Sequence, residues 1–256
     1  MSTMSVHLHA RRFSHFLCKA KMQTICLALD IETTGCKPLT HAICSIGWCV
    51  GTLPSPDSDP PSDAAFFGRV LKKGHVNIEV QWPTVVMDGS QILNYGDFEP
   101  RCWREFWADR PELQEFIKQN AVPAQEAMRQ FSAMLSELET EFPEDRFKIK
   151  VLSDNPSFDI GRLDTYLDRY VQRVPVRYSA TTNRYRPVDA PDDMLSVFPK
   201  DLVKHLMDKH INSVVQHDHN PANDAEHIYR QYVLAQRLKR TVGVMFAQQS
   251  VVSLAK

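Results

Sequence analysis

Apolar residues in the first half of the chain gather in short runs with the length and composition of β-strands. Residues 24–31 are apolar and rich in β-branched side chains, and glycine and proline follow them, which predicts a buried strand. Similar runs predict a second strand at 41–50 and a third within 64–76. The stretch 53–63, rich in proline and aspartate, lies between them as a polar hairpin loop. We expect these three strands to form a meander.

The second half of the chain shows mainly helical spacing of its apolar residues. Helices are predicted at 101–120, 123–142 and 200–210, and a fourth strand at 147–152. The apolar stripe of the second helix is Ala124, Ala127, Met128, Phe131, Met134, Leu135 and Leu138. The pattern predicts one α/β domain over residues 22–242, an extension at 1–21 and a C-terminal tail at 243–256.

Two carboxylates end the first predicted strand. Side chains alternate between the faces of a strand, so Asp30 and Glu32 project the same way while Ile31 points to the other face. Two adjacent carboxylates repel each other unless a proton or a cation lies between them, and Mg²⁺ prefers such oxygen ligands. Taken alone, the pair is more typical of a strand that runs into an acidic turn.

The pattern Asn-Pro-x-x-Asp occurs twice, at 155–159 and at 220–224. Asparagine is a favoured N-cap and proline is tolerated at the first helical position, so each copy predicts the start of a helix. Asp159 and Asp224 then fall in the first helical turn, where the helix dipole favours an ionised carboxylate. A metal ligand needs that ionised form, although an acid at a helix start is common without a metal.

These segments together resemble the motifs of a known enzyme family. The order is D-x-E after a strand, N-x-x-x-D at one helix start, and H-x-x-x-x-D at a later helix start that includes His219. It resembles the DEDD superfamily of 3′→5′ exonucleases, in the histidine subclass called DEDDh, over about residues 22–238. The resemblance implies a ribonuclease H-like fold, with a mixed central β-sheet flanked by helices, which agrees with the predicted order of strands and helices.

The resemblance also implies a role for eight residues. Two divalent ions, Mg²⁺ or Mn²⁺, would be held by the catalytic carboxylates Asp30, Glu32, Asp159 and Asp224. His219 would act as the general base, since imidazole titrates near neutral pH. The residues expected to contact the terminal nucleotide are Thr33, Thr34 and Asn155.

The expected activity is metal-dependent hydrolysis of single-stranded DNA or RNA from the 3′ end, which releases nucleoside 5′-monophosphates. The expected partners are single-stranded 3′ ends. The sequence leaves open whether the protein forms a homodimer. A catalytically weak nucleic-acid-binding or scaffold protein on the same fold is the alternative, because a fold alone does not guarantee activity. A structure-specific endonuclease is a third interpretation.

The histidines around the third motif allow another interpretation. His217, His219 and His227, with Asp218, are ligand types that zinc accepts. The spacing H-x-H-x7-H matches no recognised closed site. We therefore expect His217 to be solvated and His227 to lie on the exposed side of the last helix.

Two further segments carry groups that suit single-stranded nucleic acid. Trp103, Phe106 and Trp107 either stack on unpaired bases or, at their helical spacing, pack in the core. The stretch 173–186 combines four arginines with two tyrosines and no acid, and is either a binding segment or a solvated loop.

The composition says more about where the protein is located in the cell than about its chemistry. A net charge of −1 provides no global basic field, although bound metal ions would supply positive charge locally. The six cysteines include no C-x2-C pair, which favours reduced thiols in an intracellular, cytoplasmic protein. Residues 1–21 contain no acid, so a mitochondrial transit segment is an alternative to a poorly ordered extension. No apolar run reaches the ~20 residues of a membrane span.

Overall fold

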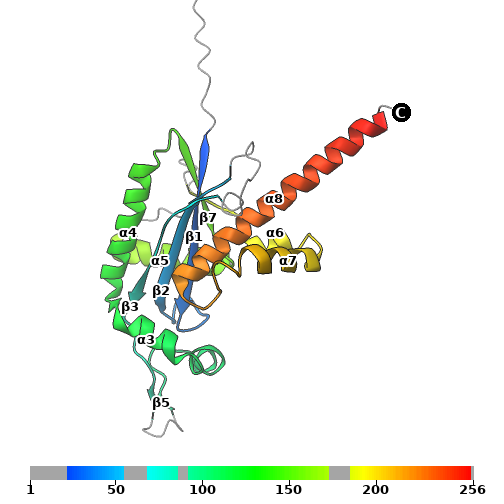
Figure 1. Ribbon diagram of the computed structural model, residues 1–256. Coiled ribbons are helices and arrows are strands. Elements are labelled where there is room, and N and C mark those ends of the chain that lie inside the picture. The colour runs from blue at the N-terminus through cyan, green and yellow to red at the C-terminus, as the bar shows by residue number, and fades with distance from the viewer. Residues whose placement is uncertain (1–21, 55–67, 86–91, 173–184, 255–256) are drawn as a thin grey trace, which may run out of the picture.

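Six strands form one mixed sheet in the computed structural model, which describes residues 22–54, 68–85, 92–172 and 185–254 (Figure 1). In spatial order they are β6 (Ala121–Val122), β3 (Val70–Ile78), β2 (Ile43–Thr52), β1 (Gln23–Thr33), β7 (Phe147–Leu152) and β8 (Tyr185–Pro187). The strands β1, β2 and β3 pair antiparallel, as the expected meander requires, and the other three pairings are parallel. A separate two-stranded ribbon joins β4 (Thr84–Val85) and β5 (Ile92–Asn94). The expected ribonuclease H-like sheet is confirmed.

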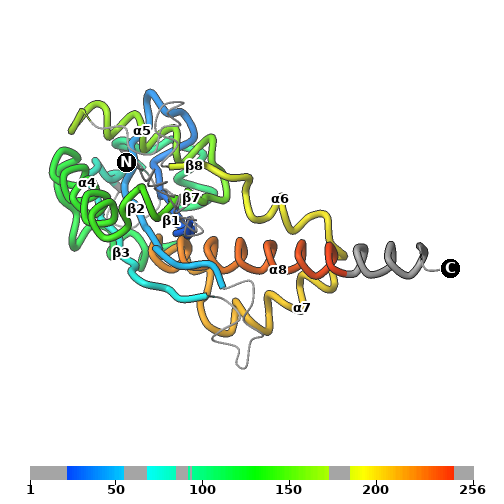
Figure 2. Tube along the Cα trace, turned by 90° about the horizontal axis from the view of Figure 1, so that it is seen from above, coloured from blue at the N-terminus to red at the C-terminus, as the bar shows by residue number. Residues whose placement is uncertain are grey.

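Helices cover both faces of this sheet (Figures 1 and 2). They are α2 (Pro100–Cys102), the π-helical turn η1 (Trp103–Trp107), α3 (Pro111–Gln119), α4 (Ala124–Glu141), α5 (Pro156–Val171), α6 (Pro191–Leu195), α7 (Lys200–His210) and α8 (Pro221–Leu254). One face packs against α4 and α5, and the other against α8 with α6 and α7 beside it. A smaller core around Trp107 joins η1 and α3.

The alternation of β1 sorts its side chains between these two layers. Ile25, Leu27 and Leu29 belong to the core under α4 and α5, whereas Cys26 and Ala28 belong to the core under α8. The even-numbered positions continue with Asp30 and Glu32, so both acids are carried on the face that α8 covers. Strand alternation therefore aims the acidic pair at the start of α8.

Glycines in β2 let α8 approach the sheet closely. Gly47 is the register partner of Asp30, and a Cβ there would lie 2.0 Å from the backbone oxygen of Pro221. A Cβ at Gly51 would likewise lie 2.4 Å from the ring of Tyr229. Glycine at these positions removes the atom that would hold the helix away from the strand. The absent side chain of Gly47 thus allows the first turn of α8 to contact β2 opposite Asp30.

The single helix predicted at 101–120 is wrong, because the segment is divided at Pro111. Arg110 adopts a non-helical backbone (φ −130°, ψ 59°), since the helical conformation is disfavoured for a residue before proline. Upstream, the amide of Ala108 donates to the carbonyl of Trp103 at 2.8 Å, the bond of a π-helical turn. Such turns occur often at functional sites. Here the wider turn buries Trp103 and Trp107 and leaves Phe106 partly exposed.

Other boundaries agree with the expectations or differ by a few residues. The strand at 147–152 and the helix at 200–210 match β7 and α7, while the second and third strands end two residues later than predicted. Helix α8 continues to Leu254, so residues 243–254, expected as a tail, are helical. The extension 1–21 and most of the loop 53–63 lie outside the described residues, as does 173–184.

Candidate metal centre and active site

Three carboxylates from two elements converge at one edge of the α8 layer. Asp30 and Glu32 come from the end of β1, and Asp224 comes from the first turn of α8. One oxygen of each lies within 4.8 Å of one oxygen of the other two. The sequence predicted this grouping, and the close approach of α8 to Gly47 brings the three acids together.

The cluster is electrostatically costly without a cation. Burial raises the pKa of Asp30 well above its ordinary value, and the charge of Glu32 raises it further. Burial, together with the charge of Asp224, also raises the pKa of Glu32, and burial raises that of Asp224 to about 6. The Oδ2 atom of Asp30 is buried and has no hydrogen-bond partner among the described residues. Several oxygen donors, one of them unpaired, fit the preference of Mg²⁺ or Mn²⁺ for carboxylate ligands.

Asp159 lies in the first turn of α5 but outside this group of three. Its Oδ2 accepts a short hydrogen bond from the Ser153 hydroxyl. Burial raises the pKa of Asp159 to about 8, so the helix start does not favour the ionised form as expected. The desolvation of a buried carboxylate outweighs the helix dipole, whose effect is about 0.3–1 kcal/mol at an exposed site. Asp159 is still close enough for its charge to raise the pKa of Asp30 and Glu32.

His219 stands beside the three acids on the link that precedes α8. Its Nδ1 lies 3.9 Å from Glu32 Oε1 and 4.0 Å from Asp224 Oδ2. The backbone is left-handed (φ 61°), and the ring of Phe106 packs edge-on against the imidazole at 4.9 Å between centroids. Burial, and then the charge of Arg110, lowers the pKa of His219. At neutral pH the imidazole is therefore unprotonated and able to accept a proton.

The three expected nucleotide contacts differ in their placement. Thr33 lines a cavity beside the acids, and its hydroxyl donates to the carbonyl of Gly35 at 3.1 Å. Thr34 is fully buried, and its hydroxyl accepts a bond from the amide of Ala42 at 2.9 Å, so its side chain stabilises the turn and does not face the cavity. Asn155 is exposed at the N-cap of α5 without a capping bond from its side chain, contrary to the expected cap.

The cavity beside the acids has a volume of about 410 Å³. Phe106 and Phe158 give it aromatic walls, and Glu32 connects it with the acidic cluster. Its other lining residues are Ile31, Thr33, Gly35, Cys36, Glu99, Arg101, Cys102 and Glu105. This cavity, next to the acidic cluster, is therefore the space that can receive part of a ligand.

Two arginines support these walls, and the sequence analysis missed both. Arg110 stacks on Phe106, with 4.3 Å between its Cζ and the ring centroid. The one feature of the sequence that could have drawn attention to Arg110 is its position directly before Pro111. Arg162 is buried behind Phe158 at 4.1 Å and donates to the carbonyl of Gly35 at 2.9 Å. No sequence signal marked Arg162, because its hydrogen-bond partners Gly35 and His41 lie more than a hundred residues away in the chain.

The other aromatic residues expected either to stack on bases or to pack in the core are mostly core residues. Trp103 and Trp107 are core residues, and the indole of Trp107 donates to the carbonyl of Thr33 at 3.1 Å. Tyr185 is buried in β8 and donates to Glu139 Oε1 at 2.9 Å, so it is not available for stacking on a base. Arg186 is exposed, and the rest of the basic segment lies outside the described residues.

The two histidines near the third motif, His217 and His227, differ in their burial. His227 is buried, and its Nε2 shares a hydrogen bond with Asn212 Oδ1 at 3.1 Å, so the exposed position expected for it is wrong. His217 is half exposed, as expected for a solvated neighbour, but its Nε2 lies 3.6 Å from Asp224 Oδ2. The contact of His227 with Asn212, which follows α7, accounts for the first, and the position of His217 in the turn before α8 accounts for the second.

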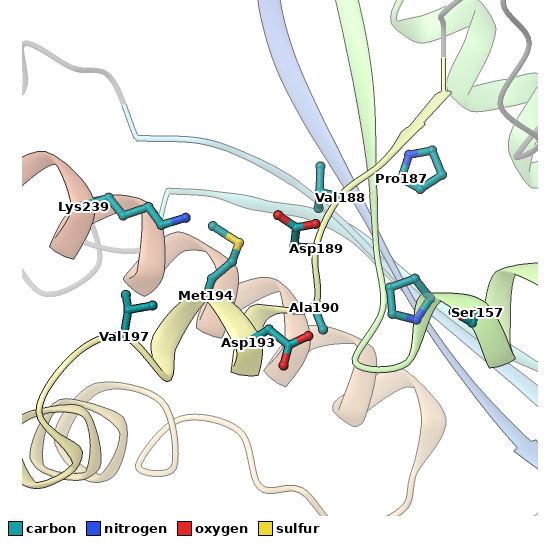
Figure 3. A pocket seen from close by; sticks show the side chains of 10 residues that line it. Ser157, Pro187, Val188, Asp189, Ala190, Asp193, Met194, Val197 and Lys239 are labelled. Atoms are coloured by element: carbon teal, nitrogen blue, oxygen red, sulfur yellow. The ribbon is translucent and has the colours of Figure 1, made fainter.

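A second cavity of about 530 Å³ lies between the start of α5, the β8–α6 link and α8 (Figure 3). Figure 3 shows Lys239 reaching toward it from α8, with Asp189 and Asp193 on the side of the β8–α6 link. It contains none of the clustered acids.

Neither a protein-family model nor a curated protein matches this chain. Solved structures do. E. coli exonuclease I in complex with a dA16 oligonucleotide matches with a TM-score of 0.51 and 13% identity, over 91% of this chain and 46% of that one. A complex called ExoI/SSB-Ct matches with a TM-score of 0.50 and 14% identity, over 91% of this chain and 46% of that one. The chain thus spans less than half the length of these structures.

In the described part of the chain, no helix combines the length and apolar character that crossing a membrane requires. The sheet order and the structural matches agree on the architecture. The chain has the ribonuclease H-like fold of the exonuclease domain of exonuclease I.

Proposed function

We propose that this protein is a metal-dependent 3′→5′ exonuclease that hydrolyses single-stranded DNA or RNA to nucleoside 5′-monophosphates. The observation that carries the proposal is the convergence of Asp30, Glu32 and Asp224 beside His219, with one buried carboxylate oxygen left without a hydrogen bond. A purely structural role would not explain three clustered acids, one buried and two partly buried, whose charges oppose one another. The likeness to exonuclease I supports the proposal through the fold.

The residues divide the chemistry among them. Asp30, Glu32 and Asp224 would hold Mg²⁺ or Mn²⁺, and Asp159 would join them once its bond to Ser153 opens. Two such ions lower the pKa of a water and stabilise the leaving oxygen of a phosphodiester. His219 accepts the proton of the attacking water, because its lowered pKa keeps the imidazole unprotonated at neutral pH.

The cavity beside the acids receives the terminal nucleotide in this proposal. Phe106 and Phe158 offer aromatic faces to a base, and the pocket reaches Glu32, where the scissile phosphate would lie. Arg110 adds a positive charge near Glu32, since its charge lowers the pKa of that acid. Asn155 and the backbone at Thr33 are proposed contacts for the same nucleotide, whereas the buried Thr34 hydroxyl is not.

The test is incubation of the protein with 5′-labelled single-stranded DNA and RNA in Mg²⁺, Mn²⁺ or EDTA. The proposal expects a ladder that shortens from the 3′ end in either metal, and intact substrate in EDTA. Asp30→Asn should abolish the ladder, because it removes a carboxylate while keeping its size. Binding without any shortening in every metal would contradict the proposal and favour a non-catalytic binding protein.

Cleavage inside the strand is the other informative outcome. A circular single strand has no 3′ end, so an exonuclease leaves it intact while a structure-specific endonuclease can open it. Hydrolysis of circular and linear substrates at equal rates would contradict the exonuclease proposal.

A further inference from the structure

A second set of possible metal ligands shares Asp224 with the acidic cluster. His217, His219 and Asp224 each place one ligand atom within 4.8 Å of the other two. His217 Nε2 lies 3.6 Å and His219 Nδ1 lies 4.0 Å from the same oxygen, Asp224 Oδ2. The two imidazole rings stand 5.1 Å apart between centroids.

We propose that His217, His219 and Asp224 form an inhibitory site for a divalent transition-metal ion of the zinc type. Tetrahedral zinc, with bonds of ~2.0–2.2 Å to nitrogen and oxygen, places neighbouring ligand atoms about 3.3–3.5 Å apart. The two separations from Asp224 Oδ2, 3.6 and 4.0 Å, exceed this by up to about 0.7 Å, which side-chain rotations can close. Two nitrogens and one oxygen, with water as the fourth ligand, match the ligand types that zinc prefers and Mg²⁺ does not.

Among the described residues, no other set of three ligand atoms that includes these histidines lies within the same 4.8 Å. His227 is 5.7 Å from His217 between ring centroids, but its Nε2 is bonded to Asn212. Asp218 is occupied as well, since its carboxylate accepts bonds from the amide of Asn220 at 3.1 Å and from the side chain of Asn223. Asp224 is therefore the carboxylate that completes the pair of histidines, seven positions after His217 and five after His219.

Inhibition follows from the shared residues and rests on the proposed function. An ion held by His219 and Asp224 occupies the imidazole that accepts the proton and one carboxylate of the acidic cluster. His217 belongs to the second set alone, and half of its side chain is exposed, so an ion can reach it from solvent. The chain thereby gains sensitivity to zinc through one residue outside the proposed catalytic group.

Co²⁺ can test the site without any measurement of activity, because it absorbs strongly in tetrahedral nitrogen-containing sites and weakly in octahedral oxygen sites. The full chain, freed of metal, is titrated with Co²⁺ as wild type, Asp30→Asn, His217→Gln and His205→Gln. Glutamine at 217 can still donate a hydrogen bond to Asp224 but is a poor ligand for these metals. His205 is an exposed histidine on α7 and serves as the matched control.

We expect strong visible absorption in wild type, Asp30→Asn and His205→Gln. In His217→Gln the absorption should be lost, and the affinity for Co²⁺ should weaken at least about tenfold, since even changes around ligands cost 10–100-fold. Equal absorption in wild type and His217→Gln would overturn the site, and so would its absence from wild type.

The inhibition is measured by adding Zn²⁺ to the nuclease reaction in excess Mg²⁺. Wild type and His205→Gln should lose activity at the same Zn²⁺ concentration, and His217→Gln should need at least about ten times more. Equal sensitivity of wild type and His217→Gln would overturn the inhibitory role. If no variant hydrolyses nucleic acid, the proposed function fails, while the Co²⁺ titration still decides on the metal site.

Discussion

At the scale of single residues, the site depends on groups whose charge the surroundings control. Burial and Arg110 lower the pKa of His219 and so keep it unprotonated, whereas burial and neighbouring carboxylates raise the pKa values of Asp30 and Glu32 and favour their protonated forms. A general base must be unprotonated and a metal ligand must be ionised. The first requirement is met by the protein alone, and the second needs a cation.

Replacing His219 with alanine should lower turnover by roughly 10²–10⁴-fold, the usual contribution of a general base. Its Nδ1 faces Glu32 and Asp224, but these carboxylates keep their own positions on β1 and α8. Thermal unfolding of the variant should therefore still shift upward with Mg²⁺. His217→Gln in Mg²⁺ alone is the control and should keep near-normal turnover. Unchanged turnover in His219→Ala would remove its assignment as the base.

Arg110→Gln should move the acid limb of the pH–rate profile to higher pH. Activity falls on the acid side as His219 becomes protonated, and the charge of Arg110 lowers the pKa of His219. Without that charge the pKa rises, so the loss of activity begins closer to neutrality. The profile of kcat measures this shift. Arg104, an exposed arginine on η1, is the matched control, and an equal shift in Arg104→Gln would contradict the explanation.

At the scale of elements, the separation between β2 and α8 decides whether the acids meet. Asp224 reaches Asp30 because the start of α8 lies directly against Gly47. The contact atoms belong to the backbone of Pro221 and Ala222, which cannot rotate away as a flexible side chain can. A single methyl group added at Gly47, which is not itself one of the clustered residues, would therefore disturb the arrangement of the acids.

Gly47→Ala should reduce activity strongly and lower the free energy of unfolding by about 1–3 kcal/mol, the usual cost of overpacking a core. The added Cβ would lie 2.0 Å from Pro221, so α8 must shift and carry Asp224 with it. Turnover and thermal unfolding together measure the two effects. Gly161→Ala in α5 is the control, because a Cβ there meets no atom within 4 Å, and alanine should stabilise a helix interior by ~0.5–1 kcal/mol. Normal activity in Gly47→Ala would contradict this role.

At the scale of the whole molecule, the buried acids couple stability to pH and to metal. Asp159 and Asp224 have folded-state pKa values of about 8 and about 6, above the ordinary value of 3.8. Between the ordinary and the raised pKa the native state binds more protons than the unfolded state, so stability falls as pH rises. The metal-free protein should thus lose stability progressively from about pH 4 to about pH 8 through these groups.

Mg²⁺ should reverse this loss, and more strongly at pH 8 than at pH 5, because it binds the ionised carboxylates. At about a hundred times its Kd, a ligand stabilises the native state by ~2.7 kcal/mol. Calorimetric unfolding should then show a rise in Tm of several degrees at pH 8. Asp224→Asn should reduce both the pH dependence and the effect of Mg²⁺. An equal rise in Tm at both pH values would contradict the explanation.

The sequence by itself determined most of the long elements and the order of the chemical groups, although the segment 101–120 and the end of α8 differ from the prediction. Strand alternation placed Asp30 and Glu32 on one face, and asparagine-proline pairs marked the starts of α5 and α8, because these preferences act between residues near in the chain. They also predicted β7 and α7 to the residue.

Only the tertiary structure decided which groups meet. The approach of α8 to Gly47, the burial of His227, the bond of Arg162 to Gly35 and the bond of Trp107 to Thr33 all depend on how the helices pack on the sheet. Burial also reversed the ionisation expected for Asp159 at the start of α5. Desolvation and contacts between distant segments appear only when the layers are assembled, so no local pattern encodes them.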